Sequence, residues 1–487
     1  MRTLHADVVV VGGGSAGMPA AVKAAQGGAK VVVLQKMSNT GGNGNRGMGV
    51  FAVETRQQRA SDRPLTRDEA FRMLMEFTHW RVNARLVKAY VDESASTVEW
   101  LESLGVEFTG PISLHPGALP TLHLTKAPPM RLGQRFSAFN AVMMRILTTK
   151  AKELGVEILL KTSGKKVLKD GERVAGVIAE DESGIQIQVN AKAVIISTGG
   201  FGDNAEWLKK YTGFELGRDL FVMGEGLGLM GDGIRMAWEA GAAQDLPVLQ
   251  LLNAIHGPGV VARAFIQSGL MVNLLGERFF NEENMSKPTF MGNAIALQKN
   301  RCAFVIFDGN QKKRFEEAEK NFDPTSSHLA TKRIEDLDAE MKDAIDQGNE
   351  NFYMANSLEE LADKTGISLD GLRETLSEYN RSCEQGHDDL LGKDPKYLLP
   401  VKEPKFYAAR LQNLAFGTLG GIRINHRAEV LTAEHESISG LYAAGYDACS
   451  IYGDSYEFDL PGGTMGFAVN SGRMAGENAV RYIRSRA

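Results

Sequence analysis

Residues 7–17 read DVVVVGGGSAG and are followed at 18–26 by the alanine-rich segment MPAAVKAAQ. The apolar run predicts a β-strand, and the alanine-rich segment predicts an amphipathic helix after a glycine turn. Gly12 permits the tight turn, Gly14 lets the backbone approach a pyrophosphate, and Gly17 allows the helix to pack closely on the strand. Because a helix N-terminus attracts phosphate, we predict a dinucleotide at this turn.

The next strand leaves the identity of the dinucleotide open. Residues 30–34 predict a second strand that ends at Gln35, where a carboxylate commonly binds ribose hydroxyls. Gln35 can also bond a ribose hydroxyl, but it lacks the charge that repels a 2′-phosphate, so NAD, NADP and FAD all remain open. Residues 40–49, TGGNGNRGMG, are too rich in glycine to start a stable helix and suit a backbone lying against a large planar ligand.

Further glycine-rich motifs follow in a fixed order along the chain. They are GGN at 41–43, STGGFG at 197–202, GDG at 231–233, GERFFNE at 276–282, GGI at 420–422 and GLYAAG at 440–445. With the first turn, this series resembles the fumarate reductase/succinate dehydrogenase flavoprotein family over nearly the whole chain. That family also includes 3-ketosteroid dehydrogenases, urocanate reductases and tricarballylate dehydrogenases.

The resemblance implies that the dinucleotide is FAD, held without a covalent bond. The family's FAD-linking histidine would fall near Asn45 and Arg46, and neither residue can form that bond. The residues that the motifs and the resemblance place against FAD are Gly12, Gly14, Ser15, Ala16, Gly17, Gln35, Lys36, Met37, Gly41, Gly42, Asn43, Gly47, Met48, Gly49, Val167, Thr198, Gly199, Gly200, Asp232, Gly445, Tyr446, Asp447, Thr464 and Met465.

The implied fold is α/β, with a Rossmann-like FAD-binding domain and an inserted α+β capping domain. A chain of 487 residues is too long for one compact core, which also favours two domains. Strand-like runs at 156–160, 173–179, 185–189 and 193–196 give way to charged helical segments between 311 and 347. We expect the FAD-binding domain at 1–250 and 410–487, and the capping domain at 251–409.

Composition excludes several other classes of protein. The chain is 43% hydrophobic and 24% charged, with a net charge of -5, and it has no basic cluster that suggests nucleic acid. No apolar run approaches the roughly 18 residues of a membrane span, and the first residues lack the apolar core of a signal peptide. We therefore expect a cytoplasmic protein that binds neither nucleic acid nor a membrane.

The electron partner is expected to be a separate molecule. The three cysteines, Cys302, Cys383 and Cys449, never form a CxxC pair, which argues against an iron–sulfur site or an attached haem. Cys449 could be a redox thiol, although a small buried hydrophobic role is the favoured interpretation. No second GxGxxG follows a predicted strand, so a built-in NADH site is disfavoured.

The segment 459–466, DLPGGTMG, precedes a predicted C-terminal helix and is expected to face the flavin. Thr464 can cap that helix. In the resembled family this helix end points at the flavin pyrimidine, where its partial positive charge stabilises the anionic reduced ring. The N–H groups around Gly462 and Gly463 are our candidates for donors to a developing enolate oxygen.

The dicarboxylate-binding residues of fumarate reductases are replaced in this chain. Gly417 stands where a histidine of the family's HTxGG motif is expected, and the proton-donating arginine falls on Ser286, beside Lys287. A second arginine falls near Leu460 and a second histidine near Leu252. Loss of these cations removes carboxylate recognition, so fumarate or succinate is not the expected substrate.

We expect hydride transfer between flavin N5 and a carbon β to a carbonyl or carboxyl group, as desaturation or ene reduction. The acid/base candidates, in order of preference, are Tyr456, Tyr452, Lys287, and then Arg131 or Arg135. Two alternatives stay open. One is a ketosteroid-dehydrogenase-like enzyme for a bulky cyclic ketone, although Phe458 occupies the position of the tyrosine found there. The other is a flavin-binding subunit without catalysis.

Overall fold

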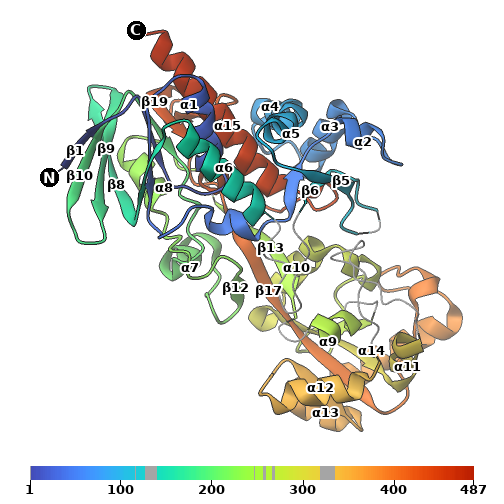
Figure 1. The fold of residues 1–487 in the computed structure, drawn as a ribbon. Coiled ribbons are helices and arrows are strands. Elements are labelled where there is room, and N and C mark those ends of the chain that lie inside the picture. Colours follow the sequence, from blue (N-terminus) through green and yellow to red (C-terminus); the bar gives the residue numbers. More distant parts are fainter. Residues whose placement is uncertain are drawn as a thin grey trace.

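A six-stranded sheet that begins at the N-terminal glycine turn is the centre of the computed structural model (Figure 1). The structure describes residues 2–115, 117–126, 140–245, 247–255, 259–265, 269–317 and 335–486. The strands, in spatial order, are β18 (Glu429–Leu431), β19 (Ser437–Ala443), β11 (Ala193–Ile196), β2 (Val8–Val11), β3 (Val31–Gln35) and β7 (Glu157–Leu160). All neighbouring pairs are parallel except β18 with β19, which is antiparallel.

The inner strands of this sheet are buried from end to end. Every residue of β2, β3 and β11 is buried, as expected for parallel strands covered on both faces. The strands predicted at 7–11, 30–34 and 193–196 agree with the structure to within one residue. The helices that begin after β2, before β7 and after the last glycine turn are α1 (Gly17–Gln26), α6 (Ala141–Glu153) and α15 (Gly463–Arg484).

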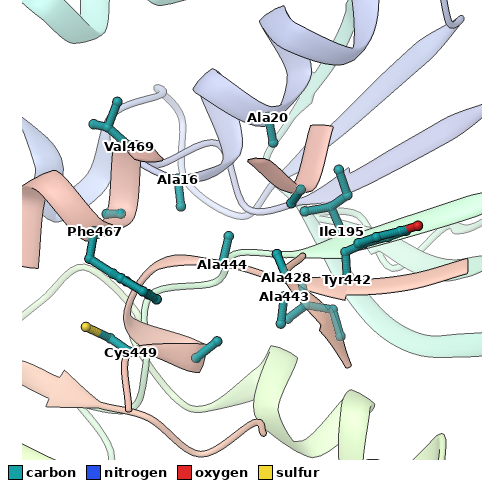
Figure 2. Packing of buried hydrophobic residues seen from close by; sticks show 14 of the residues in the cluster. Ala16, Ala20, Ile195, Ala428, Tyr442, Ala443, Ala444, Cys449, Phe467 and Val469 are labelled. Atoms are coloured by element: carbon teal, nitrogen blue, oxygen red, sulfur yellow. The ribbon is translucent and has the colours of Figure 1, made fainter. Parts of the chain in front are cut away.

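Helix α15 crosses α1 so closely that side chains are excluded from the contact. A Cβ atom added at Gly472 would lie 2.1 Å from the carbonyl oxygen of Ala16, and one at Gly476 would lie 2.4 Å from that of Ala20. Figure 2 shows this region, where Ala16 and Ala20 share one core with Phe467 of α15. The C-terminal helix is therefore fixed against the helix that starts at the dinucleotide turn.

A second sheet of four strands lies beside the first. Its order is β1 (Arg2–His5), β10 (Gln186–Asn190), β9 (Arg173–Asp181) and β8 (Thr162–Asp170). The strands predicted at 173–179 and 185–189 correspond to β9 and β10, whereas β8 was not predicted as a strand. Two helices follow this part of the chain, α7 (Ala205–Thr212) and α8 (Asp232–Glu239).

The third sheet is built around the long strand β17 (Phe406–Leu419). The sheet order is β12 (Leu220–Val222), β17, β15 (Cys302–Asp308) and β14 (Leu270–Val272), and β13 (Val248–Ala254) and β16 (Phe352–Ala355) also pair with β17. Two hydrophobic clusters around β14, β15 and the first half of β17 are separate from the core of the first sheet, whereas Leu220, Leu251 and Ala415 at the other end of this sheet belong to that core. Strands β13 and β17 run through the boundaries expected at 250/251 and 409/410, and this division into domains stays a prediction.

Helices surround the third sheet at one end of the molecule (Figure 1). They are α9 (Gly259–Ala264), α10 (Pro288–Ala296), α11 (Gly309–Glu317), α12 (Leu337–Asp346), α13 (Leu358–Thr365) and α14 (Leu369–Gln385). Helices α11 and α12 correspond to the charged segments predicted between 311 and 347. Short 3-10 helices are η1 (Gly42–Arg46), η2 (Glu282–Ser286), η3 (Lys299–Arg301), η4 (Pro395–Tyr397) and η5 (Gly445–Ala448).

A small sheet and four helices complete the fold next to α15. The sheet comprises β4 (Gly49–Phe51), β6 (Leu122–Thr125) and β5 (Phe108–Ile112). The helices are α2 (Arg56–Arg59), α3 (Arg67–Phe77), α4 (Ala84–Asp92) and α5 (Ser94–Ser103). Within the described parts of the chain, no helix has the length and apolarity needed to cross a membrane.

Candidate active site

A cavity of about 900 Å³ brings together most residues predicted to bind the dinucleotide. Those that line it are Gly12, Gly14, Ser15, Ala16, Gln35, Lys36, Met37, Gly42, Asn43, Gly47, Met48, Gly49, Thr198, Gly199, Asp232, Gly445, Tyr446, Thr464 and Met465. Gly17, Gly41, Val167, Gly200 and Asp447 lie outside this lining. The cavity therefore extends from the N-terminal glycine turn to the first turn of α15.

The glycine turn after β2 has the geometry that a bound pyrophosphate requires. A Cβ atom at Gly12 would lie 2.2 Å from the carbonyl oxygen of Ser197, and one at Gly17 would lie 1.7 Å from that of Gly12. A Cβ atom at Gly14 would meet only the carbonyl oxygen of Gly41, at 3.9 Å, so any side chain there would occupy open space beside the turn. No described side chain caps α1, which leaves its first N–H groups available to an anion.

Gln35 holds the glycine turn in place in addition to lining the cavity. Its side-chain oxygen accepts a hydrogen bond from Gly13 N at 2.9 Å, and its amide nitrogen donates to Asn39 O at 2.7 Å. Both ends of the amide therefore bind the protein backbone. A ribose hydroxyl bound by Gln35 would have to share the amide atoms with these two backbone hydrogen bonds. The sequence did not indicate these bonds.

The glycine-rich segment after β3 folds back onto the first turn. Gly41 N donates to Gly13 O at 2.8 Å, and Asn43 donates through its amide to Phe416 O at 3.0 Å. Gly41 has a φ of +102°, a conformation that favours glycine. These contacts bring the segment, the N-terminal turn and β17 to one wall of the cavity.

Asp447 supports the cavity wall from behind instead of facing a ligand. Its carboxylate accepts hydrogen bonds from the backbone N–H groups of Thr198, Gly199 and Gly200 and from the Thr198 hydroxyl. The carboxylate is fully buried, and this burial raises its pKa above the ordinary value, although the hydrogen bonds oppose that rise. Asp447 thus fixes the turn that follows β11, and Thr198 and Gly199 line the cavity.

Strand β8 contributes cavity residues that sequence reasoning missed. Val167 was the predicted contact, but Thr162, Ser163 and Gly164 at the start of the strand line the cavity instead. A Cβ atom at Gly164 would lie 2.6 Å from Val11 Cγ1, so β8 can approach the end of β2 only through a glycine. The Ser163-Gly164 pair is the sequence signal that could have indicated this contact.

The C-terminal turn presents a helix N-terminus, as predicted, but with a different cap. Gly462, with a φ of +90°, is the N-cap of α15, and no described side chain caps this end. Thr464 lies within the first turn of α15 and lines the cavity. The Gly462 carbonyl accepts a hydrogen bond from Phe51 N at 3.0 Å, which fixes the turn against β4. The first N–H groups of α15 remain available to a negatively charged ligand atom.

The structure separates the predicted acid/base candidates. Tyr456 lines the cavity, whereas Tyr452 lies outside the lining, with its hydroxyl 1.9 Å from the place where a Cβ atom at Gly463 would stand. Lys287 forms an ion pair with Asp459 at 3.2 Å and is also outside the lining. Arg131 and Arg135 lie outside the described residues. Gly462 lines the cavity and Gly463 does not.

Tyr446 forms a hydrogen bond in the cavity wall that the sequence did not indicate. It was predicted to bind FAD through its neighbourhood with Gly445, and it does line the cavity. Its hydroxyl donates a hydrogen bond to the side-chain oxygen of Gln250, at 3.0 Å. Burial raises the pKa values of Tyr446 and Tyr456 well above their usual range, and hydrogen bonding to Thr464 offsets part of that rise. Both phenols therefore stay protonated at neutral pH.

The described cations in the cavity lining already have protein partners. Lys36 donates to Asp232 Oδ2 at 3.0 Å and to Gly228 O at 3.2 Å. Arg46 donates to the backbone oxygen of Met223. The remaining described part of the lining is uncharged except for Asp232. Recognition of a carboxylate by a free cation therefore has no support in the described lining.

Together, the turn geometry, the two uncapped helix ends and the single continuous cavity fit a flavin dinucleotide and define a flavoprotein. A family model described as "FAD binding domain" matches residues 7–459, and the chain belongs to this family. Membership confirms the predicted fold and the FAD cofactor. The reductases and dehydrogenases among the chain's relatives confirm the predicted FAD-dependent oxidoreductase that acts on CH–CH bonds. The absence of a covalent flavin bond stays a prediction.

Two curated relatives match almost the whole chain. A vinyl phenol reductase of Lactiplantibacillus plantarum is 33% identical over 99% of this chain and 97% of its own length. An NADH:fumarate oxidoreductase of Klebsiella pneumoniae is 28% identical over 98% of this chain, which spans about half of that relative, 48%.

Solved structures share the fold. The 3-ketosteroid-delta4-(5alpha)-dehydrogenase of Rhodococcus jostii, in complex with 4-androstene-3,17-dione, has a TM-score of 0.76 at 23% identity, covering 99% of this chain and 98% of that one. The open conformation of a flavocytochrome c3 fumarate reductase has a TM-score of 0.69 at 25% identity, and the match covers 99% of this chain and 79% of that one.

Proposed function

We propose that this chain reduces the carbon–carbon double bond of a small aromatic alkene that carries no carboxylate, such as a vinyl phenol. The observation that carries the proposal is the charge of the cavity lining, where Lys36 and Arg46 are already bonded to protein oxygens. Within the described lining, a buried dicarboxylate would find no cation that is free of a protein partner, which costs free energy. The identity to vinyl phenol reductase over nearly the whole length of both chains supports the same substrate class.

The apolar part of the lining suits a flat aromatic ring. Apolar residues of the lining include Leu114, Leu122, Leu252, Pro288, Leu414, Phe416 and Phe458. Leu252 of β13 and Leu414 of β17 are directly opposite each other across the two strands, and Phe458 packs edge-to-face on Tyr456 with ring centroids 5.8 Å apart. Leucine and aromatic side chains give an aromatic ligand dispersion contacts and exclude water around it.

Tyr456 is the proton donor in this proposal. When bound in its reduced form, FAD supplies a hydride to one alkene carbon. The other alkene carbon then needs one proton, and hydride plus proton convert C=C into CH–CH with no net charge added. Tyr456 lines the cavity with a phenol that burial keeps protonated, so it can give up that proton and regain one from water. The electrons reach FAD from an external donor.

The first experiment mixes anaerobically reduced holoenzyme with candidate acceptors and follows reoxidation of the flavin by its visible absorption. We expect 4-vinylphenol to reoxidise the flavin, and fumarate and 4-androstene-3,17-dione to leave it reduced. Reoxidation by fumarate but not by 4-vinylphenol would overturn the proposed substrate class. Reoxidation by none of the three would favour a flavin-binding subunit without catalysis.

The second experiment tests the proton donor. Tyr456→Phe should slow reoxidation by 4-vinylphenol about 10²- to 10⁴-fold, because general acid catalysis contributes on that order. Tyr442→Phe is the matched control, since Tyr442 is a buried tyrosine in β19 whose hydroxyl donates to Asn478 O outside the cavity. Equal rates in Tyr456→Phe and the wild-type protein, with flavin content unchanged, would remove Tyr456 from this role.

A further inference from the structure

The ring of Tyr446 occupies the space beside Gly417. A Cβ atom at residue 417 would lie 2.4 Å from Tyr446 Cε2 and 2.8 Å from Cδ2, distances that side-chain atoms do not adopt. A larger residue at 417 and the present position of the Tyr446 ring therefore exclude each other. Gly417 lies within β17, and the strand is held there by β13, because Leu251 pairs with Ala415 and Leu249 pairs with Thr418.

The Tyr446 hydroxyl is fixed at one end of a polar pair. It donates to Gln250 Oε1 at 3.0 Å, and Gln250 belongs to β13, the strand next to β17. Both residues line the cavity, and no described residue accepts a hydrogen bond from the amide nitrogen of Gln250. Thr464 also hydrogen-bonds to the Tyr446 hydroxyl, so the pair leaves one oxygen lone pair of Tyr446 and the N–H donors of Gln250 for a ligand.

This arrangement matches an uncharged hydroxyl group. A phenolic O–H can donate to the Tyr446 oxygen and accept from the Gln250 amide at the same time. A carboxylate could accept only from Gln250 and would leave its charge buried without a cation. The surrounding Phe416 and Leu252 are apolar and add no charge.

The geometry points to Tyr446, held by Gln250, as the residue that recognises the phenolic oxygen of the substrate and selects it over a carboxylate or a bare hydrocarbon. The inference rests on the proposed reduction of an aromatic alkene. It gives Tyr446 a role distinct from that of Tyr456, which delivers a proton to carbon.

The test measures ligand binding and does not depend on turnover. The FAD-loaded, oxidised protein is titrated with 4-ethylphenol and with ethylbenzene, and the perturbation of the flavin spectrum gives each dissociation constant. Tyr446→Phe retains the ring beside Gly417 and removes the hydroxyl. We expect it to weaken 4-ethylphenol binding about five- to tenfold, the size of one neutral hydrogen bond, and to leave ethylbenzene binding unchanged.

Gln250→Leu is the second variant. It should selectively weaken the binding of 4-ethylphenol, because it removes the hydrogen-bond partner of Tyr446 and the amide N–H donors. Tyr442→Phe, with its hydroxyl outside the cavity, should change neither constant. If Tyr446→Phe and Gln250→Leu weaken both ligands equally, or neither ligand, the recognition role is wrong. If the wild-type protein still reduces 4-vinylphenol in that case, the proposed function is unaffected. Failure of the recognition role can therefore be distinguished from failure of the proposed function.

Discussion

Glu457 follows the proton-donor candidate Tyr456 and is buried beside a group of charged side chains. Its carboxylate accepts a hydrogen bond from the backbone N–H of Asp459. Asp459 in turn pairs with Lys287 at 3.2 Å and with His115 at 3.1 Å. Burial, followed by the nearby charge of Asp459, raises the pKa of Glu457 to about 7. The native protein therefore keeps this carboxyl protonated at pH values where an unfolded chain would ionise it.

The raised pKa of Glu457 predicts a pH-dependent cost in stability. Since the carboxyl has its ordinary pKa of 4.5 in the unfolded chain and a pKa of about 7 in the native protein, the native state binds the extra proton, and stability falls as pH rises through this window. Glu457→Gln should therefore raise the free energy of unfolding at pH 8, by up to about 3 kcal/mol, and change it little at pH 4. Urea unfolding of the FAD-loaded variants at both pH values measures this difference.

Glu434→Gln serves as the control for that measurement, because Glu434 is exposed in the turn before β19. We expect the control to change stability by the same small amount at both pH values. An effect of Glu457→Gln that is equal at pH 4 and pH 8 would show that the carboxyl does not titrate differently in the native and unfolded states.

At the scale of elements, a buried ion cluster ties the loop after β14 to the segment after α14. Arg278 donates to Glu282 at 2.8 Å and to both oxygens of Asp388 at 3.0 Å, and Lys393 lies 3.4 Å from Glu282. The side chains of all four are almost completely buried. The tertiary structure brings Asp388 and Lys393 to Arg278 and Glu282 from more than a hundred residues away.

The crossing of α1 and α15 gives a sharper prediction at this scale. Gly476→Val should destabilise the protein by about 2–4 kcal/mol, because its Cβ atom would stand 2.4 Å from the Ala20 carbonyl oxygen and the helices would have to separate. Met474→Val, at a partly exposed position of the same helix, is the control for placing a β-branched valine in α15. Equal melting temperatures for the two variants would show that the crossing tolerates a side chain.

At the scale of the whole molecule, the cavity lining is drawn from segments spread along the chain from Val11 to Ala468. A ligand in this cavity contacts the first sheet, the third sheet and the start of α15 together. Its binding free energy therefore adds to the stability of their arrangement, because the unfolded chain cannot assemble the same surface.

The flavin is predicted to be bound without a covalent link. Acid precipitation should release FAD into the supernatant, since neither Asn45 nor Arg46 can form the bond and Arg46 donates to Met223 O. In a separate experiment, apoprotein is prepared under mild conditions. It should melt at a lower temperature than the FAD-loaded form, and added FAD should restore the original melting temperature. Flavin that remains with the precipitated polypeptide would contradict the prediction.

The first strands and the glycine turn could be predicted because their signals are local, whereas FAD was predicted from a series of motifs that resembles a known family over nearly the whole chain. Val8–Val11, the turn and α1 are adjacent in sequence, so their residue types directly determine the backbone that forms. Strand β8 was missed because its sequence, TSGKKVLKD, lacks a regular apolar–polar alternation and its role depends on Gly164 meeting Val11 across the fold. Asp447 and Gln35 were predicted to lie against FAD, but the hydrogen bonds that they form with the turns arise only once distant segments meet.

The sequence by itself determined that a dinucleotide turn starts this fold, because residue identity and short spacing carry that property. FAD as the cofactor and the missing carboxylate-binding cations followed from the order of motifs along the chain, which resembles a known flavoprotein family. Only the tertiary structure decided which tyrosine faces the cavity, that Tyr452 packs beneath α15, and that Tyr446 fills the space beside Gly417. The reason is physical: orientation and exclusion depend on contacts between β13, β17 and α15, and no short stretch of sequence contains them.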